Sequence, residues 1–137
     1  MHYLRHHLAL FLALVVSACF CSAIVTAKDI STNKEPKAGI HFHNPFPKQA
    51  KAMHFTCSSK SFTVLSGQDH DWTVPMYKVE SCQVVWGHSS ASFDAYDPDI
   101  DLGHAVVFLM AKNDGFFHSW DQLTWDKKAG WVGYTQN

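Results

Sequence analysis

The sequence predicts an all-β protein, a small antiparallel β-sandwich of about eight strands. From Ile40 onward apolar and polar residues alternate, as where Ile40 and Phe42 flank His41, and a period of two is typical of strands with one buried face. Residues that favour turns separate these short runs. Since no segment shows a sustained helical stripe, closely spaced strands of this kind indicate an antiparallel sandwich.

The expected elements follow one another along the chain. The second strand alternates Met53, Phe55 and Cys57 with polar residues, and a later strand does the same with Phe93 and Ala95. The eight strands are expected near residues 40–44, 52–58, 61–65, 71–76, 79–86, 91–96, 104–112 and 115–120. Turns are expected at Asn44-Pro45, Ser66-Gly67-Gln68-Asp69, Gly87-His88-Ser89-Ser90, Asp97-Pro98-Asp99 and Asn113-Asp114-Gly115.

Residues 1–27 are expected to form a signal peptide and not part of the fold. An apolar run from 8 to 25 follows a short segment that contains Arg5, and Val25-Thr26-Ala27 supplies the small residues that signal peptidase requires. We place the cut after Ala27, with Ala23 as a second candidate. An uncleaved anchor is the alternative, but the run barely reaches the roughly 20 residues that span a bilayer.

The rest of the chain is expected to hold a flexible arm and one domain. Residues 28–39 are polar, contain Pro36 and Gly39, and show no periodicity. The 137 residues leave room for a single domain, placed at 40–137. The formal net charge of -1 argues against binding to nucleic acid or anionic membranes, because both need clustered Lys and Arg.

Signal cleavage would leave two of the four cysteines in the mature chain. Cys19 and Cys21 would leave with the signal segment, and Cys57 and Cys82 would remain. Two thiols in an oxidising compartment indicate one disulfide bond.

The order of four short motifs resembles the plant self-incompatibility protein family, the S-protein homologues, over residues 40–131. The motifs are His54-Phe55-Thr56-Cys57-Ser58-Ser59-Lys60, then Cys82 followed by three residues and Trp86-Gly87, then Ser92-Phe93-Asp94-Ala95-Tyr96-Asp97, and finally Ala111-Lys112-Asn113-Asp114-Gly115-Phe116. The chain departs from the family in its cysteines. Members usually carry two more shortly before the Asp-Gly turn, with a Trp two residues after the last one, and the aligned positions here read His104, Val107 and Leu109. Either the two remaining cysteines pair with each other, or both are free thiols.

The resemblance implies a secreted, non-enzymatic signalling or recognition protein of a plant, a ligand for a cell-surface or membrane protein partner. It implies no cofactor. The alternative is a secreted carbohydrate-binding protein or hydrolase, which the five tryptophans favour. A third reading is a structural component of the cell wall.

Two motifs resemble metal sites. His41 and His43 share one face of a strand at a spacing that can hold zinc, but no Cys, Asp or Glu stands beside them in the sequence, so we expect exposed strand histidines. The sequence Asp97-x-Asp99-x-Asp101 imitates a calcium loop. Its glycine falls one position late and it lacks the bidentate Glu, so we expect a solvated acidic turn and no metal.

One further motif resembles a catalytic pair. Asp69-His70-Asp71 can combine a base with a group that orients it, but no nucleophile motif accompanies it. We therefore expect no catalytic residue.

Partner recognition is expected in the loops, because a sandwich spends its strand residues on the core. The best candidates are the turns 67–71, 87–90 and 97–103. The residues expected to contact a partner are Gln68, Asp69, His70, His88, Asp97, Asp99 and Asp101. The alternative locations are a sheet face and the aromatic segment 120–131.

Overall fold

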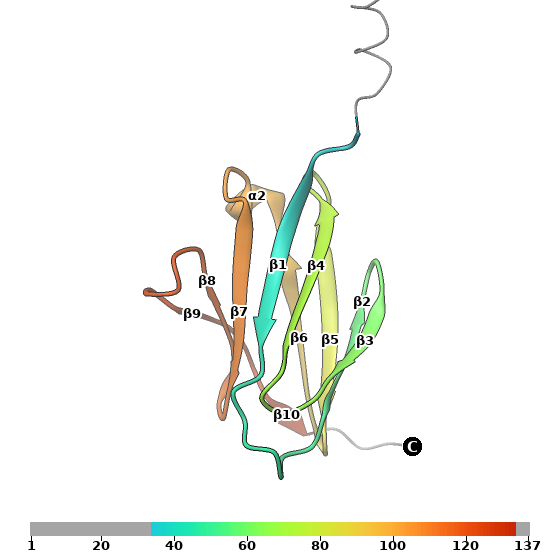
Figure 1. Cartoon of the computed structure of the whole chain (residues 1–137), viewed down its shortest axis with the longest axis vertical. Helices are drawn as coiled ribbons and strands as arrows, with labels where there is room; N and C mark the ends of the chain where they lie inside the picture. Colours follow the sequence, from blue (N-terminus) through green and yellow to red (C-terminus); the bar gives the residue numbers. More distant parts are fainter. Residues whose placement is uncertain (1–33, 134–137) are drawn as a thin grey trace, which may run out of the picture. The chain divides into compact units, whose positions relative to one another are not determined.

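Alternating side chains build two sheets that bury their apolar faces against each other. The structure is a computed structural model and describes residues 34–133 (Figure 1). Its strands are β1 (Lys37–His43), β2 (Met53–Cys57), β3 (Ser61–Val64), β4 (Asp69–Pro75), β5 (Glu80–Trp86), β6 (Ser89–Tyr96), β7 (Val106–Lys112), β8 (Gly115–Ser119), β9 (Asp126–Gly130) and β10 (Val132–Gly133), and one short helix, α2 (Pro98–Asp101), precedes β7. The predicted all-β sandwich is confirmed. Among the described residues no helix is long and apolar enough to cross a membrane.

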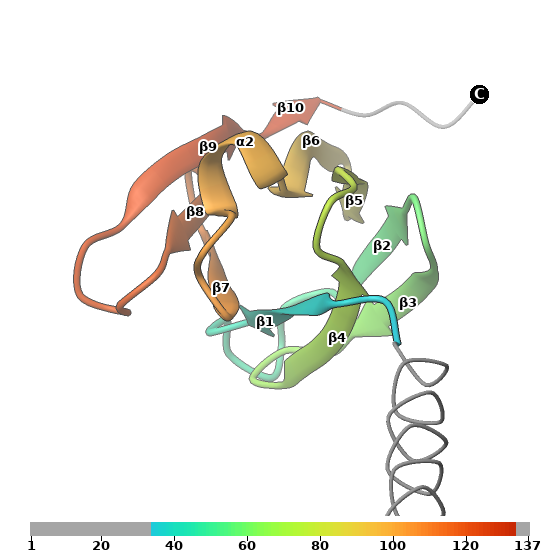
Figure 2. The same ribbon diagram turned by 90° about the horizontal axis from the view of Figure 1, so that it is seen from above.

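The first sheet has the strand order β4-β1-β7-β8-β9, and the second has β10-β6-β5-β2-β3. All pairs are antiparallel except β1 with β7. The two sheets face each other when the molecule is seen from above, with β3 beside β4 on one side and β6 beside β9 on the other (Figure 2).

The core lies between the sheets and is dominated by aromatic rings. The Phe42 ring lies 4.8 Å from that of Phe55 and 5.8 Å from that of Phe116, and all three side chains are fully buried. Trp72 is also buried, whereas Trp86 is partly buried against Phe46 at 4.4 Å. Each inward side chain packs against the opposite sheet, which is why apolar and polar residues alternate along the long strands.

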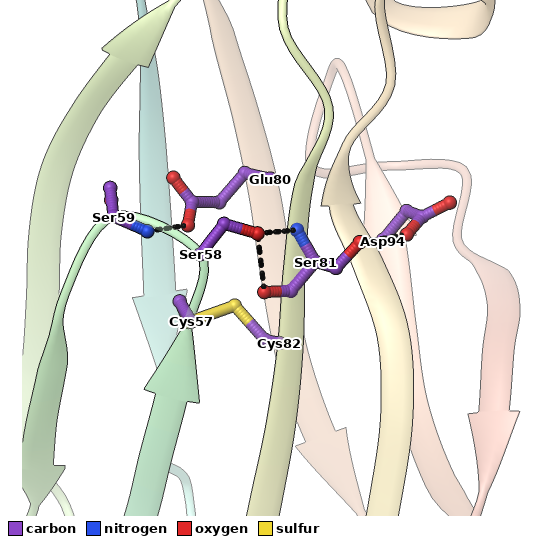
Figure 3. The surroundings of a disulfide bond; sticks show 7 residues. All are labelled: Cys57, Ser58, Ser59, Glu80, Ser81, Cys82 and Asp94. Carbon is purple, nitrogen blue, oxygen red and sulfur yellow. Dashed lines mark hydrogen bonds between the residues drawn. A yellow bond between two sulfur atoms is a disulfide. The ribbon is translucent and has the colours of Figure 1, made fainter.

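A disulfide bond joins the two cysteines expected to remain after signal cleavage. Cys57 in β2 lies directly opposite Cys82 in β5, with their Cα atoms 4.0 Å apart (Figure 3). The pairing alternative is therefore confirmed. Val107 and Leu109 are buried in β7 as part of the core.

The largest differences from the expected strands lie at the two ends of the described chain. β1 begins at Lys37, so residues 37–39 belong to the sheet and not to a flexible arm, and Ala38 is fully buried. Gly39, read as a breaker, donates its backbone N–H to the Ala105 carbonyl at 2.9 Å. β9 and β10 were not expected because β9 reads DKKAG, without alternation. It forms because the chain folds back along β8. The expected signal peptide lies outside the described residues.

Most of the connections fall at two opposite ends of the sandwich. The helix α2 lies at one end, and the β8–β9 connection projects from the side of the sandwich (Figure 1). The β3–β4 and β5–β6 turns lie at the other end, since Asp69 pairs with His43 at the end of β1, and Trp86 pairs with Met53 at the start of β2.

Candidate recognition surfaces

The expected contact residues do not form one patch. Gln68, Asp69 and His88 lie at the end of the sandwich that carries the β3–β4 and β5–β6 turns. Asp97, the N-cap of α2, and Asp99, within α2, lie at the opposite end (Figure 1). Gln68 accepts a hydrogen bond from the Leu65 backbone at 3.4 Å, and Asp97 caps α2 through the Asp99 N–H at 3.0 Å. The side chains of Gln68 and Asp97 therefore use hydrogen-bonding atoms to hold their own turns.

His70 is not an exposed loop residue. It lies in β4 opposite Phe42, so its side chain points toward the core, and its ring stacks on Phe62 at 3.9 Å. Burial, followed by the nearby charge of Lys60, lowers the pKa of His70 below its ordinary value of 6.5. The flanking aspartates point to the opposite face, so the Asp-His-Asp motif assembles no base with its orienting carboxylate.

Asp101 is buried, which corrects the expected solvated acidic turn. Its side chain is 0% exposed and accepts hydrogen bonds from His118 Nε2, Trp120 Nε1 and the Asp97 backbone, each at 2.9 Å. Burial by itself raises the pKa of Asp101, but these hydrogen bonds outweigh it and hold the pKa below its ordinary value. Asp101 therefore anchors the 97–104 segment and is not accessible to a partner.

The β8–β9 connection, residues 120–125, is a loop locked by hydrogen bonds among its own residues and to Ser119 at the end of β8. The Ser119 hydroxyl accepts from the Asp121 and Gln122 backbones at 3.2 and 2.8 Å. The Asp121 carboxylate accepts from the Leu123 and Thr124 backbones at 2.8 and 2.9 Å, and these bonds lower the pKa of Asp121. Gln122 has a φ of 62°, a left-handed conformation that a non-glycine residue adopts only when its surroundings impose it.

This locked loop displays an apolar side chain. Leu123 is 85% exposed, the largest exposed fraction among the described large apolar residues. Trp120, at the base of the loop, is 40% exposed and stacks on His104 at 4.1 Å, which links the loop to the segment that carries the exposed Ile100 and Leu102. We use the name apolar end surface for these four exposed apolar residues (Ile100, Leu102, Trp120 and Leu123), which lie on two segments joined through the Trp120 contacts with His104 and Asp101.

A second surface lies on the outer face of the first sheet. His41 pairs with Asp71 and His43 pairs with Asp69 across β1 and β4. No acid stands beside these histidines in the sequence, but the fold brings to them two aspartates that are distant in the sequence. A hollow of about 250 Å³ adjoins these pairs and is lined by His41, His43, Asp69, Phe108, Leu109, Met110, Gln122 and Trp125.

In the described part of the chain, one group brings three metal-ligand atoms within 4.8 Å of one another: Cys57, Glu80 and Cys82. Both sulfurs belong to the disulfide, so they have no thiolate to offer. Glu80 instead accepts a hydrogen bond from the Ser59 backbone at 2.8 Å (Figure 3) and holds the β2–β3 turn.

Sequence reasoning missed the main features of both surfaces. The spacing of Ser119 and Asp121 is a signal for a self-bonded turn, because Ser and Asp side chains accept hydrogen bonds from backbone groups two or three residues ahead. The cross-strand pairing of His41 and His43 left no local signal, since it depends on which strand lies beside β1. Comparison of the chain with protein-family models, with curated proteins and with solved structures found no match.

Proposed function

We propose that the protein is a secreted, non-enzymatic recognition protein that binds a protein partner at the cell surface through its apolar end surface. The observation that carries this proposal is Leu123, 85% exposed on a loop that is already locked by hydrogen bonds. Burying a leucine side chain contributes about 2 kcal/mol. Because the loop is ordered before binding, little of that gain is lost to conformational entropy.

The motif resemblance supports a place in the plant self-incompatibility family, with a membrane protein as the partner. The disulfide and the two-sheet sandwich are in keeping with a small extracellular domain. The near-neutral formal charge favours a protein partner over a polyanion. The signalling role, the plant origin and the secretion are parts of this proposal.

The apolar end surface has the composition of a protein-binding surface. Trp120 and Leu123 lie on one loop, and Ile100 and Leu102 flank the buried Asp101 that bonds to the Trp120 indole. Aromatic and aliphatic anchors on a rigid support commonly dominate binding energy. Asp99 and Asp121 are exposed polar residues on the same two segments, as is common at the edge of an interface.

The test compares two exposed leucines on different loops of the sandwich. Leu123→Ser removes the proposed anchor, and Leu65→Ser changes a residue that is 53% exposed in the β3–β4 turn. Labelled secreted protein is titrated onto membranes from the plant tissue that expresses the gene. A loss of about 2 kcal/mol weakens saturable binding about 30-fold.

The expected result is weaker binding for Leu123→Ser and unchanged binding for Leu65→Ser, with both variants melting at the wild-type temperature. Equal binding by the wild type and Leu123→Ser would overturn the location of the surface. An absence of saturable binding by the wild type would overturn the recognition function itself.

The carbohydrate-binding alternative is favoured by the hollow beside Trp125, where aromatic rings adjoin a carboxylate. A glycan array separates the two. Selective glycan binding that is lost in Trp125→Ala and retained in Leu123→Ser would support the alternative.

A further inference from the structure

Two histidines and two aspartates face one another on the outer side of the first sheet. His41 lies opposite Asp71, and His43 opposite Asp69, in the antiparallel register of β1 and β4. Residues two apart on a strand share a face, so all four side chains project on one side while Ile40 and Phe42 fill the core on the other.

Asp69 lies between the two imidazole rings. One of its carboxylate oxygens is hydrogen-bonded to His43 Nδ1, and the other lies 3.6 Å from His41 Nε2. The second aspartate, Asp71, is hydrogen-bonded to His41 Nδ1, which turns the Nε2 of that ring toward Asp69. The side chains of His41, His43 and Asp69 are 30%, 39% and 49% exposed, so solutes can reach them.

Two imidazoles and one carboxylate form a ligand set that suits zinc and similar divalent transition metals. We propose that His41, His43 and Asp69 bind one such ion, and that Asp71 orients the His41 ring. Metal-bound histidines usually donate their second ring N–H to a carboxylate, a backbone carbonyl or water, and Asp71 already provides such an acceptor for His41.

The separation of the two nearest donor atoms fits this ion. If zinc binds one nitrogen and one oxygen, each at about 2.1 Å and with a tetrahedral angle between the two bonds, the two ligand atoms lie about 3.4 Å apart. His41 Nε2 and Asp69 Oδ2 are 3.6 Å apart, close to that value. The pair therefore needs little rearrangement to hold the metal.

The third ligand requires one side-chain movement. The His43 nitrogen is engaged with Asp69, and the three donor atoms do not converge in this conformation. Turning the His43 ring exchanges its hydrogen bond for a metal bond, and its exposure lets the ring turn without repacking the core. Three protein ligands leave a coordination position open to water, with Phe108, Met110 and Trp125 lining the adjoining hollow.

The test is calorimetric titration of the secreted protein, freed of metal with EDTA, with zinc chloride. We expect saturable binding of one ion per chain. His41→Gln and Asp69→Asn should each weaken it at least about ten-fold, and Asp71→Asn about ten-fold through loss of ring orientation. The matched control is His54→Gln, because His54 is also an exposed strand histidine but is paired with Thr63 on the other sheet.

Zinc affinity that is unchanged in His41→Gln, or weakened equally by His54→Gln, would overturn the proposal. Imidazole NMR spectra of the wild type give a second test that needs no variant. Zinc should shift the ring signals of His41 and His43 and leave those of His54 and His88 in place. Shifts confined to other histidines would also overturn it. Since neither measurement involves Leu123 or a partner, the outcome is independent of the proposed recognition function.

Discussion

Replacing Asp101 with alanine tests whether one buried carboxylate holds the α2 end of the sandwich together. Asp101 is fully buried and accepts hydrogen bonds from His118, Trp120 and the Asp97 backbone. In Asp101→Ala these donors lose their acceptor together. His118, which is 4% exposed, would be left in the interior without its carboxylate partner.

The expected loss of stability follows from the donors that Asp101→Ala leaves without an acceptor. Leaving a buried donor without its acceptor costs about 1–3 kcal/mol, and Asp101→Ala removes the acceptor of three donors, so we expect a loss of about 3 kcal/mol or more. Small domains have a total stability of about 5–15 kcal/mol. Each kcal/mol moves the melting temperature by about 4–8 °C, so we expect a fall of at least about 12 °C.

Urea unfolding and calorimetry measure this effect. The matched control is Asp99→Ala, two residues away, where the side chain is exposed and the change should stay within about 0.5 kcal/mol. Asp101→Asn keeps an acceptor oxygen and should fall between the control and Asp101→Ala. A loss below about 1 kcal/mol in Asp101→Ala would refute the reasoning, since it would mean that the donors find water or new partners.

Three further predictions follow from the packing, the cross-link and the same carboxylate. Replacing both Cys57 and Cys82 with alanine should lower the free energy of unfolding by about 3 kcal/mol, because the disulfide joins residues 25 positions apart in the sequence. A melting temperature that does not change when the disulfide is reduced would contradict this. Gly115→Ala should prevent folding or strongly destabilise the chain, because an added Cβ would overlap the Ala129 carbonyl in β9 and the φ of 147° disfavours any side chain. Circular dichroism measures the effect, and the control Gly67→Ala, whose added Cβ meets no atom within 4 Å, should remain folded. The pKa of Asp101 is held below its ordinary value of 3.8, so its ionised form stabilises the fold above pH 3.8, and this contribution is lost as the pH falls through the lower folded-state pKa. In urea titrations the difference in stability between the wild type and Asp101→Asn should therefore narrow below pH 3.8. A difference that stays constant with pH would contradict this prediction.

The strands that sequence analysis placed are those whose side chains alternate between core and solvent. Ile40 and Phe42 in β1, and Met53 and Phe55 in β2, lie on the buried face as expected. A period of two is a local property of the chain, so it is readable without knowledge of the neighbours. β9 was not predicted because its sequence shows no such alternation, and it pairs with β8 only because the chain folds back as a hairpin.

The candidate sites were harder to predict because they depend on which segments meet. The turns 67–71 and 97–103 look alike in the sequence, as polar stretches with glycine and aspartate. The structure puts them at opposite ends and buries Asp101 completely, since its partners His118 and Trp120 come from β8 and the connection that follows it. Burial of a single polar residue is decided by distant partners and not by local composition.

The sequence by itself determined the class of fold, most of the strand positions and the two cysteines available for one bond. These features depend on alternation, turn chemistry and residue counts, which act over a few residues. Only the tertiary structure decided that Cys57 pairs with Cys82, that Asp69 and Asp71 stand beside His41 and His43, and that Leu123 projects from a locked loop. Strand order and register bring together side chains that are far apart along the chain, and no local pattern in a single sequence specifies which strands become neighbours.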